Sequence, residues 1–297
     1  MSTIFITGSS GFVGLNLIKY LTSFFKFYKY ERETPICIYQ DVVIHLAGKA
    51  HDFKKISNSN EYFQVNTELT KTVFDAFLAS NAKVFITLSS VKAVADEVEG
   101  ELTEDYIPSP ITNYGKSKLQ AEQYILSKLI PEGKRVYILR PCMIHGPGNK
   151  GNLSLLYKLV SKGFPWPLGA FDNQRSYCSI DNLIFIIKEL IDRDDIPSGV
   201  YNVADNETLS TNQLISLIAE SQNIKPMVCY LPKSLIKSFA KLGDMIQLPL
   251  TTERLQKLTE SYIVSNQKIK SAIGKNLKVS AKDGLLKTFN SFHTNAQ

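Results

Sequence analysis

Residues 3–14 read TIFITGSSGFVG, and this stretch decides the fold. Its first five residues are mostly β-branched or aromatic, which predicts a strand. Gly8, Gly11 and Gly14 follow at intervals of three, and the next residues place leucine and isoleucine on one helical face. A strand, a glycine-rich turn and a helix in this order are typical of a dinucleotide-binding unit, because the glycines let a pyrophosphate approach the backbone at a helix N-terminus.

Strands and helices continue to alternate through the first half of the chain. Further strands are predicted over residues 41–46, 84–88 and 135–139, and helices over 65–79 and 114–128. This alternation predicts an α/β fold with a doubly wound parallel sheet. Beyond Gly146 glycine and proline become frequent, so we expect a nucleotide-binding domain over 1–165 and a smaller C-terminal substrate domain over 166–297, interleaved with the first.

The first half of this sheet is predicted to be shortened. Only about 35 residues separate Thr7 from Asp41, whereas two βαβ steps need about 60. A helix over 11–23 and a second strand over 25–30 use most of them. Residues 36–39 are apolar and extended, but a single residue separates them from the next strand, and parallel neighbours need a crossover of about a dozen residues or more. We therefore predict that the second helix and its crossover are missing, and that 36–39 form an antiparallel edge or a return segment.

Composition excludes several classes of protein. The chain has 297 residues, of which 44% are hydrophobic and 21% charged, unlike disordered, collagen-like or disulfide-rich chains. The four cysteines and four histidines show no metal-ligand spacing, so we expect buried thiols and no metal. No signal peptide or membrane span is expected, which favours a cytoplasmic protein. The net charge of +6 is spread along the chain, so it suits an anionic small ligand better than a nucleic acid.

A second group of residues carries the signature of redox chemistry. Tyr114 and Lys118 are four residues apart in a predicted helix, so their side chains share one face. An ammonium beside a phenol lowers the phenol pKa, so Tyr114 can exchange a proton with a substrate hydroxyl while a nicotinamide carries the hydride. Ser90 follows the strand 84–88 at the sheet edge where ligands bind, and its hydroxyl can bond the same substrate oxygen.

These motifs together resemble the extended short-chain dehydrogenase/reductases of the NAD-dependent epimerase/dehydratase family, which act on nucleotide sugars. The resemblance covers most of residues 1–215, in the order that the family shows, and it implies a Rossmann-like sheet. The matching segments are TGSSGFVG (7–14), DVVIHLAGKAH (41–51), YFQVNTELT (62–70), FITLSSVKAV (85–94), NYGKSKLQAEQYI (113–125), LRPCMIHGPG (139–148), RSYCSIDNL (175–183) and GVYNVADNETLST (199–211).

The resemblance also implies roles for individual residues. The catalytic residues are expected to be Ser90, Tyr114 and Lys118. A UDP-sugar substrate is expected at Ser90, Asn152, Arg175 and Arg254, since an arginine fork matches phosphate geometry. NAD or NADP is expected at Gly8, Ser10, Gly11, Phe12, Val13, Gly14, Glu31, Arg32, Leu46, Ala47, Gly48, Asn66, Ser89, Tyr114, Lys118, Pro141 and Met143.

The residues near the tip of the second strand leave the choice of cofactor open. A carboxylate there favours the free 2′-hydroxyl of NAD, and an arginine favours the 2′-phosphate of NADP. The chain offers both, as Glu31 and Arg32. The shortened segment 31–40 is expected to leave the adenine more exposed.

The residues after Ser90 narrow the reaction that the resemblance implies. Dehydratases of the family carry a Thr-Asp-Glu pattern there, whereas this chain has Val91 and Lys92, which disfavours 4,6-dehydration. Hydride transfer at C4 of a UDP-hexose or UDP-N-acetylhexosamine by a 4-epimerase, in surface-polysaccharide biosynthesis, is then expected. A reductase of UDP-4-keto-6-deoxy sugars and a non-catalytic nucleotide-binding protein are the alternatives.

Two surfaces carry expectations about partners. Family members form dimers through the helix that holds Tyr114, so a homodimer is expected. Residues 235–246 place apolar side chains at helical spacing beside lysines that recur every four residues. A solvated helix that packs on the substrate domain is expected there, and contact with a membrane surface or a partner is the alternative.

Overall fold

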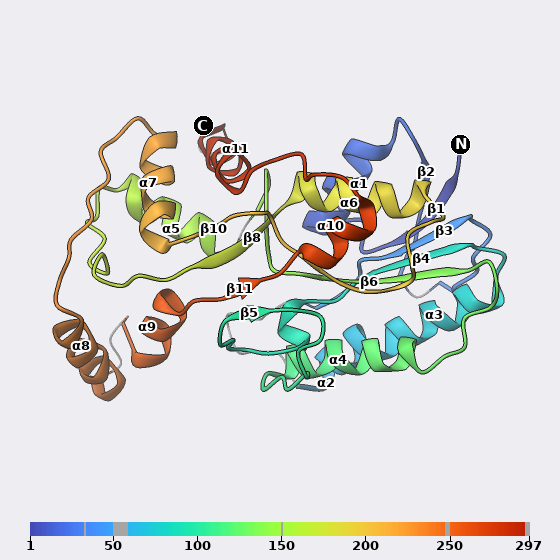
Figure 1. Cartoon of the computed structure of the whole chain (residues 1–297), viewed down its shortest axis with the longest axis horizontal. Coiled ribbons are helices and arrows are strands. Elements are labelled where there is room, and N and C mark those ends of the chain that lie inside the picture. Colours follow the sequence, from blue (N-terminus) through green and yellow to red (C-terminus); the bar gives the residue numbers. More distant parts are fainter. Residues whose placement is uncertain (33, 50–58, 150, 247–249, 295–297) are drawn as a thin grey trace.

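The computed structural model describes residues 1–32, 34–49, 59–149, 151–246 and 250–294. The chain folds around a six-stranded sheet in the order β2-β1-β3-β4-β6-β9, and every pair in it is parallel (Figure 1). The strands of this main sheet are β1 (Thr3–Thr7), β2 (Lys26–Lys29), β3 (Val42–His45), β4 (Val84–Leu88), β6 (Arg135–Pro141) and β9 (Gly199–Val203).

Helices cover both faces of the main sheet, which explains why its central strands are almost continuously apolar. On one face α1, α6 and α10 pack over a core that contains Ile4, Leu17 and Leu183. On the other face α3 and α4 pack over a core that contains Phe74 and Ile125 (Figure 1). The helices of this half are α1 (Phe12–Leu21), α2 (Ser59–Phe63), the π-helix η1 (Gln64–Glu68), α3 (Leu69–Ala79), the 3₁₀ turn η2 (Val91–Ala93), α4 (Asn113–Leu126), α6 (Ile180–Asp192) and α10 (Gln267–Ile273).

A second, smaller half has its own hydrophobic core, to which α5, α7 and α11 contribute. A three-stranded sheet, β10-β8-β7, leads into it, and the pair β11-β5 ties a late segment to the loop after β4. Its elements are β7 (Met143–His145), α5 (Asn152–Ser161), β8 (Arg175–Ser179), β10 (Thr208–Leu209), α7 (Thr211–Ser221), α8 (Lys233–Ile246), α9 (Thr252–Thr259) and α11 (Ala281–Thr294), with β5 (Glu101–Leu102) and β11 (Ile263–Val264) at the junction.

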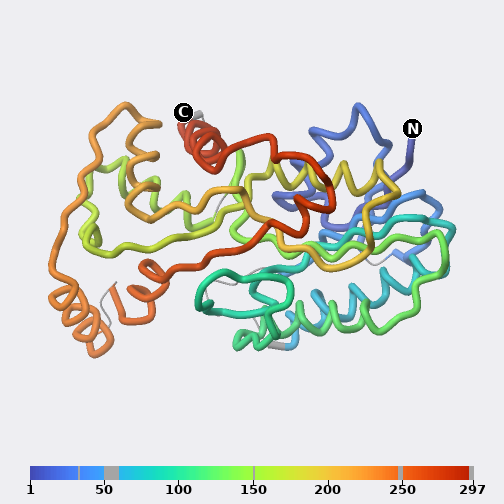
Figure 2. Tube along the Cα trace, viewed as in Figure 1, coloured from blue at the N-terminus to red at the C-terminus, as the bar shows by residue number. Residues whose placement is uncertain are grey.

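The chain crosses between the two halves more than once. After α5 and β8 it returns to the main sheet as α6 and β9, and then leaves again for β10 and α7 (Figure 2). We therefore keep the division at residue 165 as a proposal, in which α6 and β9, although they follow the boundary, belong to the first domain.

The shortened first half of the sheet is present as predicted. In the described residues between β2 and β3 there is no helix, and β2 is the outermost strand of the sheet. Residues 36–39 form no strand, so the antiparallel-edge alternative is wrong and the return segment is correct. Ile38 is buried in the same cluster as Phe5 and Phe74. The return segment thus covers part of the sheet face that a crossover helix would cover.

The helix predicted over residues 65–79 is interrupted. It forms as α2, then a π-helical turn over Gln64–Glu68, then α3. A π-helical turn shifts the register of the side chains within a helix, and such turns are frequent at functional sites. Asn66 and Thr67 are the buried residues of this turn.

Candidate active site

The glycine turn leaves an open helix N-terminus at the carboxyl edge of the main sheet. Gly8 has φ +68°, and a Cβ there would lie 2.6 Å from the backbone nitrogen of Ala47. A Cβ on Gly14 would lie 2.4 Å from the carbonyl oxygen of Gly8. Gly11 caps α1 without a side-chain hydrogen bond, and the first turn of α1 has no acidic residue. Free N–H groups and the positive end of the helix dipole are therefore available, which fits the pyrophosphate of a dinucleotide.

The predicted cofactor residues lie along this same edge. Lys29 pairs with Ile6, so Glu31 and Arg32 follow the end of β2 near the glycine turn, and both are exposed. Pro141 ends β6 and Met143 begins β7 at the far side of the edge. Other predicted residues of this group occupy the turn after β1, the first turn of α1 and the segment after β3: Ser10, Phe12, Val13, Leu46, Ala47 and Gly48.

His45, which sequence reasoning set aside, lies at the centre of a buried hydrogen-bond chain beneath this edge. Thr7 Oγ1 accepts from the amide of Ala47 at 3.1 Å and lies 2.7 Å from His45 Nδ1. His45 Nε2 lies 2.9 Å from Thr70 Oγ1, which itself donates to the carbonyl of Asn66 at 2.7 Å. Because the Thr70 proton is already used, Nε2 donates to Thr70 Oγ1. The pKa of the ring is lowered to about 3, so the imidazole is neutral and Nδ1 accepts from the Thr7 hydroxyl.

Because His45 is buried in this hydrogen-bond chain, we predict that the protein becomes less stable in acid. Burial and, to a smaller extent, the nearby Lys118 charge lower the pKa of His45 to about 3. The unfolded chain binds a proton near pH 6.5, whereas the folded chain does not, so stability falls as the pH drops from about 6.5 toward 3. At pH 5 the loss is about 2 kcal/mol relative to pH 7.

Urea unfolding of the wild type and of His45→Gln at pH 7 and pH 5 checks this expectation. The variant should be less stable at pH 7, but its loss between the two pH values should be smaller by about 2 kcal/mol. His293→Gln is the matched control, because His293 is exposed in α11. An equal pH dependence in all three proteins would exclude His45 as the titrating group.

The π-helical turn presents Asn66 to two segments at once. Asn66 Oδ1 accepts from the backbone amide of Lys49 at 2.7 Å, and Nδ2 donates to the carbonyl of Lys49 at 3.1 Å and to Ser117 Oγ at 3.0 Å. Ser117 Oγ in turn donates to the carbonyl of Tyr114 at 2.8 Å. Asn66 therefore fixes the segment after β3 relative to the first turn of α4.

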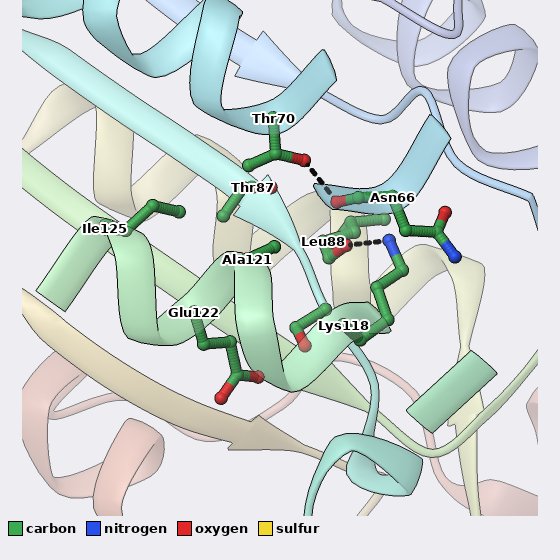
Figure 3. Close-up of a pocket in the computed structure, with 9 residues that line it drawn as sticks. Asn66, Thr70, Thr87, Leu88, Lys118, Ala121, Glu122 and Ile125 are labelled. Carbon is green, nitrogen blue, oxygen red and sulfur yellow. Dashed lines mark hydrogen bonds between the residues drawn. The ribbon is translucent and has the colours of Figure 1, made fainter. Parts of the chain in front are cut away.

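Ser90, Tyr114 and Lys118 are brought together, as predicted. Ser90 begins the 3₁₀ turn after β4, and its hydroxyl is hydrogen-bonded to Tyr114. The Tyr114 ring lies edge-on to Tyr62, with ring centroids 6.4 Å apart. Lys118 Nζ donates to the carbonyl of Leu88 at 2.9 Å (Figure 3). A hydroxyl, a phenol and an ammonium therefore meet just beyond the end of β4.

Burial sets the proton affinities of this group. It raises the pKa of Tyr114, while the Ser90 hydrogen bond opposes the shift. It lowers the pKa of Lys118 to about 8, against the opposing effect of the Glu122 carboxylate. Glu122 is held by Arg140, whose Nε donates to both carboxylate oxygens at 3.0 and 3.1 Å. Lys118 is thus mostly charged at neutral pH, one helical turn from the phenol.

A small cavity lies beside Lys118, between β4, α4 and η1 (Figure 3). Ser89 lies in its wall, and the Ser89 Oγ is buried with no hydrogen-bond partner in the described chain. An orphaned hydroxyl next to a buried ammonium fits a ligand that brings hydroxyl groups of its own. The residues that line the cavity are Asn66, Thr70, Thr87, Leu88, Ser89, Lys118, Ala121, Glu122 and Ile125.

Across from this site, β8 presents Arg175 from the second half. Its Nη2 donates to Glu260 Oε1 at 2.8 Å, whereas its Nε is buried and has no hydrogen-bond partner among the residues that the structure describes. Lys92 lies nearby, with Nζ 4.2 Å from the centroid of the Tyr262 ring. Burial lowers the pKa of Lys92, the Glu260 carboxylate opposes this, and the Arg175 guanidinium adds to it. Lys92 follows Ser90 by two residues, so two cations border the predicted sugar site.

The other two predicted substrate residues lie further out. Asn152 begins α5 and Arg254 lies in α9, and both are exposed in the second half. Their contact with a substrate remains a prediction.

A serine, a tyrosine and a lysine at the ligand-binding edge of a Rossmann-like sheet define a nucleotide-dependent oxidoreductase site. The sequence profile of the NAD dependent epimerase/dehydratase family matches residues 38–204, more than half of the chain. The chain belongs to that family. The membership confirms both the predicted fold class and an NAD(P)-dependent enzyme of the epimerase and reductase kind.

Individual relatives extend the comparison over nearly the whole chain. A protein of Vibrio cholerae named UDP-glucose 4-epimerase is 29% identical over an alignment of 323 positions, gaps included. The alignment covers 98% of this chain and 95% of the relative. A GDP-6-deoxy-D-mannose reductase of Pseudomonas aeruginosa is 26% identical and covers 75% of this chain and 81% of the relative. The structure of MoeE5 in complex with UDP-glucose and NAD has a TM-score of 0.76 at 18% identity, with 100% of both chains covered, which supports the fold.

Proposed function

We propose that this protein is a UDP-sugar 4-epimerase that transfers hydride at C4 of a hexose or N-acetylhexosamine in surface-polysaccharide biosynthesis. The observation that carries the proposal is that three side chains converge beyond the end of β4. Ser90 begins the turn after this strand, Tyr114 lies in the first turn of α4, and Lys118, one helical turn later, donates to the carbonyl of Leu88 at 2.9 Å. The relative named UDP-glucose 4-epimerase, which aligns over almost the full length, supports the choice of reaction.

The chemistry follows from the three side chains. Ser90 and Tyr114 both bond the C4 oxygen of the sugar, and Tyr114 removes its proton as the carbon gives up a hydride. A bound nicotinamide supplies the hydride acceptor. Burial raises the Tyr114 pKa. The role of the Lys118 ammonium is to stabilise the phenolate that forms when Tyr114 loses its proton. Tyr114 returns the proton when the hydride is returned to the opposite face of the rotated ketone.

The cofactor would be held by the edge already described. The open N-terminus of α1 would take the pyrophosphate, and Asn66 would hold the segment from Leu46 to Gly48 against it. The orphaned Ser89 hydroxyl would bond a polar group of the cofactor. Glu31 and Arg32 would meet the adenosine ribose, so NAD and NADP both remain candidates.

Arg175 is expected to bind the diphosphate of the sugar nucleotide, because its Nε has no hydrogen-bond partner in the described chain and so leaves one edge of the guanidinium fork available. Arg175→Leu should raise the KM for the nucleotide sugar by about tenfold to a hundredfold while kcat changes much less, as steady-state kinetics will show. Arg175→Lys, which keeps the charge and loses the fork, should give an intermediate KM. A KM unchanged in both variants would remove Arg175 from the substrate site.

Incubation with a panel of nucleotide sugars tests the proposed reaction. UDP-glucose, UDP-galactose, their N-acetyl counterparts and a UDP-4-keto-6-deoxy sugar are supplied in turn, with NAD or NADPH. Interconversion of C4 epimers without net consumption of NAD(P)H identifies the epimerase. Stoichiometric loss of NADPH with the keto sugar identifies the reductase instead. Cofactor binding with no turnover of any sugar would favour a non-catalytic nucleotide-binding protein.

The 4-reductase remains the second candidate because one observation favours it. A reductase uses the same three side chains for the second half of the reaction only, and a named 6-deoxy-sugar reductase covers 75% of this chain.

We also propose a homodimer through α4. Light scattering after size exclusion checks the dimer.

A further inference from the structure

The outer surface of α8 exposes an unusual concentration of large apolar side chains. Leu235, Phe239, Leu242 and Ile246 form what we call the apolar stripe, and they are 44%, 52%, 44% and 58% exposed. Their spacing of four, three and four residues places them along one line of the helix. Met245, at 80%, lies close to this line. Single exposed apolar residues are ordinary, but a continuous line of them marks a contact surface.

The remaining faces of α8 are already assigned. Ile236, Ala240 and Gly243 are buried, and α8 packs on α9. Lys233, Lys237 and Lys241 repeat every four residues on a separate, exposed face. The helix therefore has one face for the protein, one apolar face without cover in the described chain, and one row of positive charge. A charged row and an apolar row on one short helix are the features of helices that lie in a lipid–water interface.

We propose that α8 binds the surface of an anionic lipid bilayer, with the apolar stripe at the level of the acyl chains and the lysines reaching the headgroups. The charge pattern favours an anionic bilayer as the partner, because the three lysines in one row match anionic headgroups. The aliphatic parts of the lysine side chains can extend along the interface. The helix lies at the outer end of the second half, remote from the main sheet (Figure 2). A flat surface can thus meet it without displacing a packed element. In the described part of the chain no helix is suited to crossing a bilayer.

The position of α8 connects this surface to the site. α8 packs on α9, and Gln256 of α9 donates to Glu97 at 2.6 Å. Glu97 lies seven residues beyond Ser90. α8 is thus linked through α9 to the segment that follows Ser90. Catalysis on a free nucleotide sugar does not require this contact, since α8 carries none of the proposed catalytic residues.

Co-sedimentation with vesicles tests the proposal. The full chain should pellet with vesicles of phosphatidylcholine and phosphatidylglycerol in a 3:1 ratio, should bind pure phosphatidylcholine much more weakly, and should be released by salt. Leu235→Ser, Phe239→Ser and Leu242→Ser combined should weaken binding by about tenfold or more. Lys233→Gln, Lys237→Gln and Lys241→Gln combined should remove the preference for the anionic vesicles.

The matched control replaces three apolar side chains that are at least as exposed but lie elsewhere. Ile107→Ser, Leu155→Ser and Phe164→Ser combined should leave vesicle binding unchanged, since these residues are 83%, 65% and 59% exposed outside α8. Absence of binding to anionic vesicles, or an equal loss in the control, would overturn the proposal. So would a dimer in light scattering that the α8 serine variant abolishes, because a second copy of the chain would then cover the stripe. Turnover of free nucleotide sugars, measured in parallel, reports separately on the proposed function.

Discussion

Tyr114→Phe is expected to lower kcat by about a thousandfold while cofactor binding stays within about twofold of the wild type. The substitution keeps the ring, and with it the contact to Tyr62 at 6.4 Å between centroids. It removes the hydroxyl that is hydrogen-bonded to Ser90 and that exchanges the proton in the proposed reaction. Positioned proton transfer of this kind contributes about a hundredfold to ten-thousandfold, so the loss should fall mainly on kcat.

Steady-state turnover and cofactor titration by fluorescence together check this expectation. Tyr124→Phe is the matched control, because Tyr124 lies in the same helix and its hydroxyl donates to the exposed Asp75 carboxylate, at 2.7 and 2.8 Å, rather than to a residue of the proposed site. Turnover in the Tyr124 variant should be close to that of the wild type. Normal turnover in the Tyr114 variant would refute the proposed acid–base role.

The substitution with the largest expected effect on the cofactor is Gly8→Ala. Gly8 has φ +68°, and an added Cβ would lie 2.6 Å from backbone atoms of both Leu46 and Ala47. The left-handed conformation alone costs about 1–2 kcal/mol for an alanine. Since neither contact is to a flexible side chain, the turn or the segment after β3 must move. We expect a loss of several degrees in Tm and a cofactor Kd raised by about tenfold or more.

Thermal unfolding and cofactor titration measure the two effects. Gly133→Ala is the control, because Gly133 has φ +79° and no atom of the described, non-neighbouring residues lies within 4 Å of an added Cβ there. The control isolates the cost of the backbone conformation, so it should lower Tm slightly and leave the cofactor Kd unchanged. A Kd in the Gly8 variant equal to that of the control would show that the turn does not hold the cofactor.

The features that could be predicted from the sequence are those that local pattern determines. The glycine turn, the strand over residues 84–88 and the helix that begins near Tyr114 depend on neighbouring residues and match the structure closely. The missing crossover was predictable from the number of residues. Once the first helix and the second strand are placed, too few residues remain before Asp41 for a crossover helix and a further parallel strand.

The features that could not be predicted depend on contacts between distant segments. The π-helical turn has an ordinary helical sequence, and its role appears only when Asn66 meets Lys49 and Ser117. Arg175 was predicted, but its partner Glu260 lies 85 residues later in a region without a recognised motif. His45 sits in an apolar strand, where a histidine gives no indication of whether it meets hydroxyl partners, as it does here, or simply fills space.

The missing crossover leaves β2 as an edge strand, and no other strand of the described chain pairs with its outer side. An exposed edge is a template for pairing with a strand of another chain, which leads to aggregation. Here the strand reads KFYK and has only four residues, with exposed lysines at both ends. The short length and the charge of β2 oppose the addition of a further strand. The edge of the sheet is therefore protected from pairing with another chain although its first half is short.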